Sequence, residues 1–255
     1  MINSYYNWFD LYVKGFYGED ALVNQNIKLK EEHTLKVAKH SLEIANSLKL
    51  SEEEKSIAEI IGLFHDIGRF EQFKKYKTFR DNLSVNHSIL GIRILEEHKV
   101  LHNLPEETKD IITKAICYHN KKELPNSLLG EEAIFCKIIR DADKLDIYRV
   151  SLKHEKERQL NPNPALDNLP FTEDYNKNII KEILAGRKLS NSQLKCYNDR
   201  KLYELGWILD LNFPFSFKYI KTKNILEDLT KCLPQTEEII GLYKFLDNYI
   251  QEHLQ

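Results

Sequence analysis

Long amphipathic segments with helical spacing occupy most of this 255-residue sequence. The pattern is clear in residues 27–48, where apolar side chains recur three or four positions apart, at Leu35, Ala38, Leu42 and Ala45. This is the spacing of one helix face. The chain holds only nine glycines and seven prolines, so few positions interrupt such segments. We therefore expect an all-α protein.

Several segments also carry the signals that start a helix. Ser51 followed by Glu54 forms a capping box, and Pro105 ahead of two glutamates suits a helix N-terminus. Further helical patterns cover residues 131–148, 172–184, 193–209, 213–220 and 236–253. Two stretches lack a clear pattern and are expected to be long loops, residues 68–84 and 159–174.

The second of these loops is the best candidate for a domain boundary, because it contains Pro162, Pro164 and Pro170. We expect a helical core over residues 1–155 and a helical C-terminal extension over residues 156–255 that packs on this core. A chain of 255 residues is long enough for one large core with an appended lobe.

The charge balance gives no sign of a polyanionic partner. The chain has 37 basic and 39 acidic residues and a formal net charge of -2, so we expect neither a nucleic-acid polymer nor a membrane as partner. The sequence shows no signal-peptide pattern and no apolar stretch near the roughly 20 residues of a membrane helix. Its four cysteines form no CxxC pair, which argues against a thiolate zinc site. These features are typical of a soluble cytoplasmic protein.

Five separate segments each place a metal-competent side chain at the edge of an apolar helix face. His65 follows Ile61 by four residues, and Asp143 follows Ile139 by four, so each shares a helix face with core positions. One such histidine would most simply be a hydrogen-bonded core residue. Burying several imidazoles and carboxylates without partners is costly, whereas a shared cation uses them as ligands. The full set is His33, His65, Asp66, His87, His119 and Asp143.

Four histidines and two aspartates are more than one tetrahedral site uses. Nitrogen and oxygen ligands without thiolate suit iron, manganese, nickel, cobalt or zinc better than calcium or magnesium alone. Asp66 is adjacent to His65 in the sequence and could bridge two ions. The expected cofactor is therefore a divalent transition metal, as two ions, with magnesium at one site as an alternative.

The order and context of these six residues resemble the HD-domain superfamily of metal-dependent phosphohydrolases. Its two-metal members have the ligand order His, His-Asp, His, His, Asp. The family's alanine-aspartate-basic-leucine arrangement selects Asp143 over Asp141 as the last ligand. The resemblance implies an all-α HD-domain core and covers about residues 27–150, in the stretches "EEHTLKVAKHSLEIANSL", "IIGLFHDIGRF", "NHSILGIRIL", "AICYHNKK" and "CKIIRDADKLDIYRV".

If two ions bind there, phosphoester hydrolysis assigns further roles. Asp66 would bridge the ions and help to hold a metal-activated water. Lys144 and Arg69 each closely follow a ligand and would act in catalysis by contacting a phosphoryl oxygen, with a solvated surface position as the alternative for both. Asp146 is either an acceptor that orients a ligand histidine or a surface charge. Gly68 would let the chain turn sharply away after His65 and Asp66.

Other features have simpler interpretations. Residues 69–81, "RFEQFKKYKTFRD", would form a solvated loop whose aromatic side chains dock on the core, or a lid over a phosphate and a base. Residues 154–159, "HEKERQ", are expected to be a solvated helix end. His40 is expected to be a satisfied core or surface residue. His98, His102, His154 and His253 are expected at the surface, and Tyr5, Tyr6, Trp8 and Phe9 are expected to dock the first helix.

The leading hypothesis is a metal-dependent phosphohydrolase that cleaves a phosphoester or phosphoanhydride of a nucleotide or a similar small molecule. The six-ligand pattern also resembles the di-iron HD oxygenases. A third hypothesis is a non-catalytic nucleotide-binding regulator, which a six-ligand site disfavours. The expected partner is a small phosphorylated substrate. The sequence does not specify that substrate, the native metal or the oligomeric state.

Overall fold

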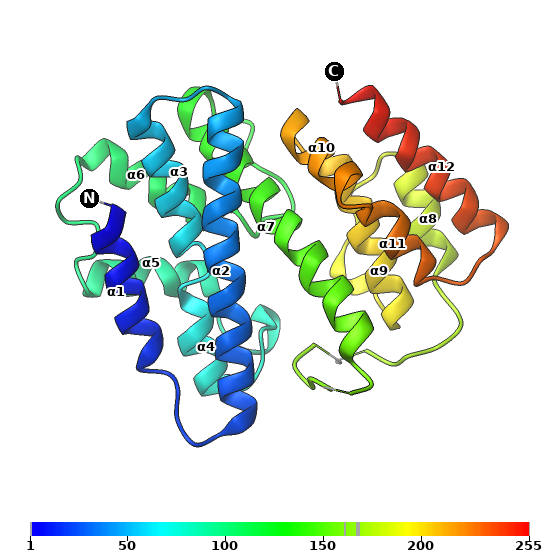
Figure 1. Ribbon diagram of the computed structural model, residues 1–255, viewed down its shortest axis with the longest axis horizontal. Helices are drawn as coiled ribbons and strands as arrows, with labels where there is room; N and C mark the ends of the chain where they lie inside the picture. The colour runs from blue at the N-terminus through cyan, green and yellow to red at the C-terminus, as the bar shows by residue number, and fades with distance from the viewer. Residues whose placement is uncertain (1, 161, 167–168, 255) are drawn as a thin grey trace. The chain divides into compact units, whose positions relative to one another are not determined.

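The computed structural model describes residues 2–160, 162–166 and 169–254. Within these residues every regular element is an α-helix or a short 3₁₀ helix (Figure 1), which confirms the all-α prediction. The chain divides into two compact units, Met1–Asp146 and Ile147–Gln255. The division falls inside the long helix α7 (Gly130–Glu157), whereas the predicted boundary at residue 155 lies close to the end of that helix.

Helices α2 and α3 pack side by side in the first unit (Figure 1). Helix α2 begins after Asp20, whose side chain accepts a hydrogen bond from the Val23 amide. Helix α3 begins at the predicted capping box, in which Ser51 and Glu54 bond reciprocally. Besides α7, the elements of this unit are α1 (Ile2–Lys14), α2 (Ala21–Ser47), α3 (Glu52–Phe64), α4 (Gly68–Tyr76), η1 (Asp81–Leu83), α5 (His87–Glu97) and α6 (Glu106–Tyr118).

Aromatic side chains attach α1 to the rest of the first unit, as the sequence predicted. Tyr5 and Trp8 make edge contacts with Phe64, at ring-centroid distances of 6.0 and 5.8 Å. Phe9 contacts Phe70 in the same way at 5.8 Å. Such edge contacts add to the stabilisation that burial of large apolar rings provides.

Residues 68–84 are not the long loop that the sequence indicated. Helix α4 fills the first half and buries Phe70 and Phe73, and η1 follows after Lys77, which has a left-handed φ of 54°. The helical pattern was hidden because α4 has only nine residues and is mostly charged outside its aromatic positions. The two phenylalanines dock on the core, as the simpler interpretation of this segment expected, whereas Tyr76 is exposed.

Gly68 allows close packing, and the turn that the sequence placed at this glycine occupies residues 65–67 just before it. The backbone stays in the right-handed helical region at His65 (φ -55°, ψ -37°) and at Ile67 (φ -56°, ψ -31°), and α4 begins at Gly68. A Cβ atom on Gly68 would overlap the carbonyl oxygen of His87 and lie 2.8 Å from the Gly91 amide nitrogen. Glycine is needed here because the backbones of α4 and α5 touch.

Polar side chains help to set the starts of two helices in the second unit. Asn176 accepts a hydrogen bond from the Asn178 amide, and Asp199 accepts from the Lys195 and Cys196 amides. The helices predicted over 172–184 and 193–209 therefore begin later than expected. The elements are α8 (Lys177–Leu184), η2 (Asn191–Gln193), α9 (Tyr197–Gly206), η3 (Trp207–Asp210), α10 (Pro214–Thr222), α11 (Ile225–Lys231) and α12 (Glu237–Glu252).

No helix in the described part of either unit combines the length and the apolar character that a membrane crossing requires.

Three of the four histidines predicted at the surface are exposed, and the fourth is not. His154 is buried, with Nδ1 2.7 Å from the Tyr197 hydroxyl oxygen. Glu155 and Arg158 line a cavity, so residues 154–159 are not simply a solvated helix end. Sequence pattern missed these contacts because they join residues far apart in the chain. The exposed histidines are His98, His102 and His253.

Candidate metal centre

Six side chains from five segments of the first unit converge on one centre. Helices α2 and α7 contribute one ligand candidate each from within the helix, and the others lie at helix ends. The six are the residues that the sequence predicted as metal ligands, namely His33, His65, Asp66, His87, His119 and Asp143.

Helix ends position the remaining candidates. His65 is the C-cap of α3, and His119 is the C-cap of α6. His87 is the first residue of α5, and the Asn86 side chain caps that helix by accepting from the Ser88 and Ile89 amides. The apolar faces of these helices are buried, so each helix end is held where its terminal side chain points toward the same centre.

One half of the centre contains two histidines between two carboxylates. Asp143 Oδ1 lies 3.1 Å from His33 Nε2 and 3.6 Å from His65 Nε2. Asp66 Oδ2 lies 3.6 Å from each of the same two nitrogen atoms. One ligand atom from each of His33, His65 and Asp143 lies within 4.8 Å of the other two. These three residues form a first group that could hold an ion.

The other half contains the remaining histidines. Asp66 Oδ1 lies 3.2 Å from His87 Nε2 and 3.7 Å from His119 Nε2, and these two nitrogens are 3.1 Å apart. Ligand atoms of His65, Asp66 and His119 form a second group within 4.8 Å. Asp66 thus presents one oxygen to each half, which is the arrangement that a bridging carboxylate requires.

Two of the four imidazoles are held by carboxylates at their other ring nitrogen. His33 Nδ1 lies 2.8 Å from Asp146 Oδ2, so Asp146 occupies the acceptor role and not the surface position that the sequence left open. His87 Nδ1 lies 2.7 Å from Asp81 Oδ2. A carboxylate acceptor at Nδ1 fixes the ring orientation and raises the basicity of Nε2.

Backbone carbonyl groups hold the other two imidazoles. His65 Nδ1 lies 2.8 Å from the Gly62 oxygen, and His119 Nδ1 lies 2.7 Å from the Ile116 oxygen. A carbonyl oxygen can only accept, so both rings carry their proton on Nδ1 and keep the Nε2 lone pair for a cation. All four histidines thus direct Nε2 to the centre.

The donor set fits divalent transition metals. The Nε2 atoms of His33 and His65 are buried and have no hydrogen-bond partner within the described ranges. A buried polar atom without a partner costs about 1–3 kcal/mol, and coordination of a cation would remove that cost. Imidazole and carboxylate ligands without thiolate are typical of iron, manganese, cobalt, nickel or zinc sites.

Both carboxylates are ionised at neutral pH. Burial alone would raise the pKa of Asp66, but Lys30, His65 and Arg69 outweigh burial and hold the pKa well below its usual value. Burial also opposes the charge on Asp143, and the adjacent His33 and His65 lower its pKa well below the usual value. Anionic carboxylates are the form that coordinates metal ions.

The histidines differ in their response to burial. Burial lowers the pKa of His119 to about 4, and neighbouring His87 and His65 add to that effect while Asp66 opposes it. Burial also opposes the charge on His33, but its contacts with two aspartates raise its pKa overall. The contribution of a raised histidine pKa to the free energy of unfolding is fully present below about pH 6.5 and is lost as the pH rises through the raised pKa. His33 and His119 therefore change the free energy of unfolding in different pH ranges.

We expect the metal-free protein to lose stability as the pH falls from about 6.5, the ordinary histidine pKa, to about 4, the pKa of buried His119. In this window unfolded His119 binds a proton that the folded imidazole excludes, so the free energy of unfolding rises with pH by up to about 1.4 kcal/mol per pH unit. Urea titrations at several pH values measure this slope. His119→Asn should reduce it and exposed His102→Asn should not; an unchanged slope in H119N would contradict the assignment.

Lys30 belongs to the centre, although the sequence analysis did not identify it. Its Nζ lies 2.7 Å from Asp66 Oδ2 and 5.3 Å from the centroid of the Phe79 ring. Lys30 precedes His33 by three residues on α2, and this spacing places both side chains on one helix face. That spacing was the signal in the sequence that could have found it.

The two cations that the sequence assigned to catalysis make different contacts. Arg69 Nε lies 3.3 Å from Asp66 Oδ1, so Arg69 borders the centre. Lys144 Nζ donates to the carbonyl oxygen of Arg140, 3.2 Å away and one turn back on α7. This contact is with its own helix, and the catalytic role of Lys144 stays a prediction.

Asp81 connects Arg69 to a ligand histidine. Its Oδ1 accepts hydrogen bonds from Arg69 Nη1 and Gln72 Nε2, each at 2.9 Å, while its Oδ2 contacts His87. Burial would raise the pKa of Asp81, but His87, Arg69 and Gln72 outweigh burial and lower it to about 2. The segment after α4 therefore supplies a carboxylate that orients a ligand candidate, a role that the sequence analysis did not identify.

Asp81→Ala is expected to weaken metal binding by about 10–100-fold, which is the usual effect of removing a carboxylate that orients a ligand histidine. The change leaves His87 Nδ1 without its acceptor, while the Asp81 side chain is 31% exposed, so the fold should persist. Competition with a chromogenic chelator measures the affinity. Exposed Asp110→Ala on α6 is the matched control, and equal affinities in the two variants would contradict this role for Asp81.

An all-helical unit with four histidines and two aspartates around a buried centre defines a metal-binding helical domain. The family model of the HD domain matches residues 31–148, which include all six candidate ligands. This match identifies residues 31–148 as an HD domain and supports the resemblance to the HD-domain superfamily that the motifs indicated. Searches among curated proteins and among solved structures found no match.

Proposed function

We propose that this protein hydrolyses a phosphoester or phosphoanhydride bond of a nucleotide or a similar small molecule in a metal-dependent reaction. The observation that supports this most directly is the position of Asp66, whose two oxygens face two groups of imidazole nitrogens. A carboxylate shared in this way suits a dinuclear hydrolytic site. The HD domain provides the reaction class, and the substrate is part of the proposal.

The chain's own residues prepare the site for an anionic substrate. Ions held by the six ligands would supply Lewis acidity and an activated water. Lys30 and Arg69 contact different oxygens of Asp66, at 2.7 and 3.3 Å, so two fixed cations border the centre. Cations held in place beforehand stabilise the charge that develops on a phosphoryl group.

Contacts on the far side of the guanidinium keep Arg69 in position. Its Nη1 donates to the Phe79 carbonyl oxygen at 2.5 Å and to Asp81 at 2.9 Å. These bonds restrict the side chain before any substrate arrives, which reduces the entropy lost on binding. We assign Arg69 to phosphate binding on this basis and give Lys30 the equivalent role that the sequence had suggested for Lys144.

The first experiment combines elemental analysis with hydrolysis assays on the purified full chain. Metal-free protein is reloaded anaerobically with manganese, cobalt, zinc or iron and tested on nucleoside mono-, di- and triphosphates and on cyclic nucleotides. We expect about two equivalents of metal, because six ligands exceed one tetrahedral site, and release of phosphate or of a nucleoside monophosphate without oxygen.

The alternatives give different results in the same assays. A di-iron oxygenase would show no turnover without oxygen and would consume oxygen when loaded with iron. A non-catalytic regulator would bind metal and nucleotide without consuming the nucleotide. Failure of the fully metallated protein on every phosphoester tested would refute the proposed hydrolysis.

A further inference from the structure

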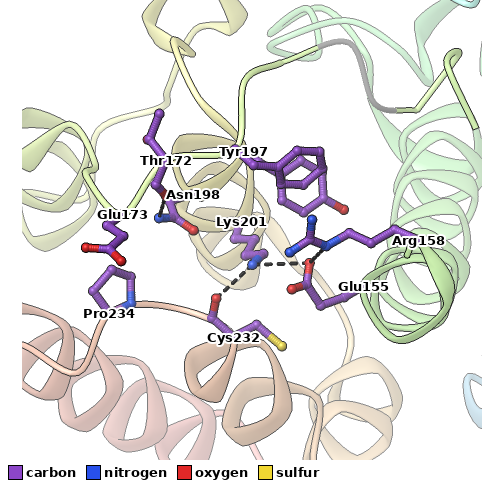
Figure 2. A pocket seen from close by; sticks show the side chains of 10 residues that line it. Glu155, Arg158, Thr172, Glu173, Tyr197, Asn198, Lys201, Cys232 and Pro234 are labelled. Carbon is purple, nitrogen blue, oxygen red and sulfur yellow. Dashed lines mark hydrogen bonds and ion pairs between the residues drawn. The ribbon is translucent and has the colours of Figure 1, made fainter. Parts of the chain in front are cut away.

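The second unit contains a cavity of its own, with a volume of about 390 Å³ (Figure 2). Its walls come from the end of α7 and Arg158 just after it, from residues 171–173, from the first two turns of α9, and from Cys232 and Pro234. Small-molecule sites in proteins usually occupy about 300–1,000 Å³. None of the residues that line it belongs to the six candidate metal ligands.

Two cations and one carboxylate meet at this cavity, as Figure 2 shows. Lys201 is 6% exposed, and its Nζ donates to the Cys232 carbonyl oxygen at 2.7 Å. Glu155 Oε2 lies 3.2 Å from Lys201 Nζ and 3.6 Å from Arg158 Nε. Neither contact is a hydrogen bond, since Glu155 Oε2 has no hydrogen-bond partner in the described ranges. Within the inner lining one carboxylate, 19% exposed, is shared by two cations, which leaves an excess of positive charge among these lining residues.

The second acidic residue of the lining does not cancel this excess. Glu173 is exposed at the cavity, so solvent and salt screen its charge. Lys201 by contrast is buried, where the interaction with an anion is screened much less. The inner part of the cavity therefore favours an anionic group.

Arg158 is fixed by an aromatic ring and keeps its hydrogen-bond donors. Its Cζ lies 4.0 Å from the Phe171 ring centroid, and the Phe171 and Tyr197 centroids are 4.5 Å apart. The Arg158 Nε is buried and has no hydrogen-bond partner within the described residues. A stacked guanidinium with unused donors is well suited to phosphate recognition.

Phe171 also offers an exposed aromatic surface. The side chain is 44% exposed although Arg158 covers part of it. Aromatic rings bind other planar rings in stacked or edge-on geometry. An anion-binding floor with an exposed aromatic ring beside it matches a ligand that has both a phosphate and a planar base.

We propose that this cavity binds a small anion bearing an aromatic ring, of the nucleoside monophosphate class. The phosphate would lie between Lys201 and Arg158, and the base would stack against Phe171. The inference is independent of the proposed hydrolysis, because the two sites share no residue and binding here needs no metal ion.

Calorimetric titration of the metal-free full chain with AMP, in the presence of a chelator, tests the proposal. Adenosine and ribose 5-phosphate serve as probes that each lack one half of the ligand. We expect AMP to bind at least about tenfold more tightly than either, since a charge-assisted contact is worth this much or more. Lys201→Met and Arg158→Gln should each weaken AMP binding about tenfold or more.

Lys231→Met is the matched control, because Lys231 on α11 is 66% exposed and pairs with Glu227 outside the cavity lining. AMP binding that survives both K201M and R158Q but is lost in Asp66→Ala would place the ligand at the metal centre and overturn the inference, while supporting the proposed function. No AMP binding, or equal affinity for AMP and ribose 5-phosphate, would also overturn it. If circular dichroism shows that K201M unfolds, the less buried Arg158 variant decides.

Discussion

Asp66→Ala is expected to remove bound metal and to lower the rate of phosphoester hydrolysis by about 1,000-fold or more, since metal ions supply several kcal/mol of transition-state stabilisation. The Asp66 side chain is only 4% exposed, and its oxygens face both groups of imidazoles. Its loss therefore takes one ligand from each half of the centre. Phosphate release at saturating substrate and elemental analysis of the same preparation measure the two effects together.

The matched variants separate loss of metal from loss of fold. Asp66→Ala leaves Lys30 and Arg69 beside each other without the carboxylate that both contact, and repulsion between them could destabilise the unit. Asp66→Asn keeps the side-chain volume, and Asp110→Ala removes an exposed carboxylate on α6. Circular dichroism should show folded protein in all cases. Wild-type metal content and rate in D66A would mean that Asp66 is not a ligand.

The six convergent residues could be found in the sequence because they lie on or at the ends of helices with a visible apolar period. Position along the chain does not give direction in space, however, and the two cations that the sequence predicted to act in catalysis illustrate this. Arg69 follows Asp66 by three residues and contacts it, whereas Lys144 follows Asp143 by one residue and its ammonium bonds to its own helix. One residue along a helix is a rotation of about 100°, so adjacent residues face different neighbours.

Contacts between distant segments were beyond the reach of the sequence pattern. Asp81 lies in a stretch with no regular period, yet it accepts from Arg69 and contacts His87. His154 lies in a charged stretch of the sequence, yet it is buried in the structure. Its Nδ1 contacts the hydroxyl group of Tyr197, which lies far along the chain. In both cases the partner is set by packing of whole helices, which local periodicity does not encode.

Gly68→Ala is expected to destabilise the metal-free protein by about 3 kcal/mol and to lower its Tm by roughly 10 °C. The added methyl group would overlap the His87 carbonyl oxygen and lie 2.8 Å from the Gly91 amide nitrogen. Backbone atoms cannot rotate aside as a flexible side chain can, so α4 and α5 must separate. Thermal unfolding followed by circular dichroism measures the loss.

The same change should also weaken metal binding, because His87 is the first residue of α5 and moves with it. Gly241→Ala is the matched control: a Cβ at this exposed position in α12 meets nothing within 4 Å, and alanine favours a helix by up to about 1 kcal/mol. It should keep the metal affinity, and its Tm should stay the same or rise by a few degrees. If G68A retained the wild-type Tm but lost metal affinity, the contact between α4 and α5 would serve to place His87 and not to stabilise the fold. If both were retained, the close approach of these backbones would matter to neither.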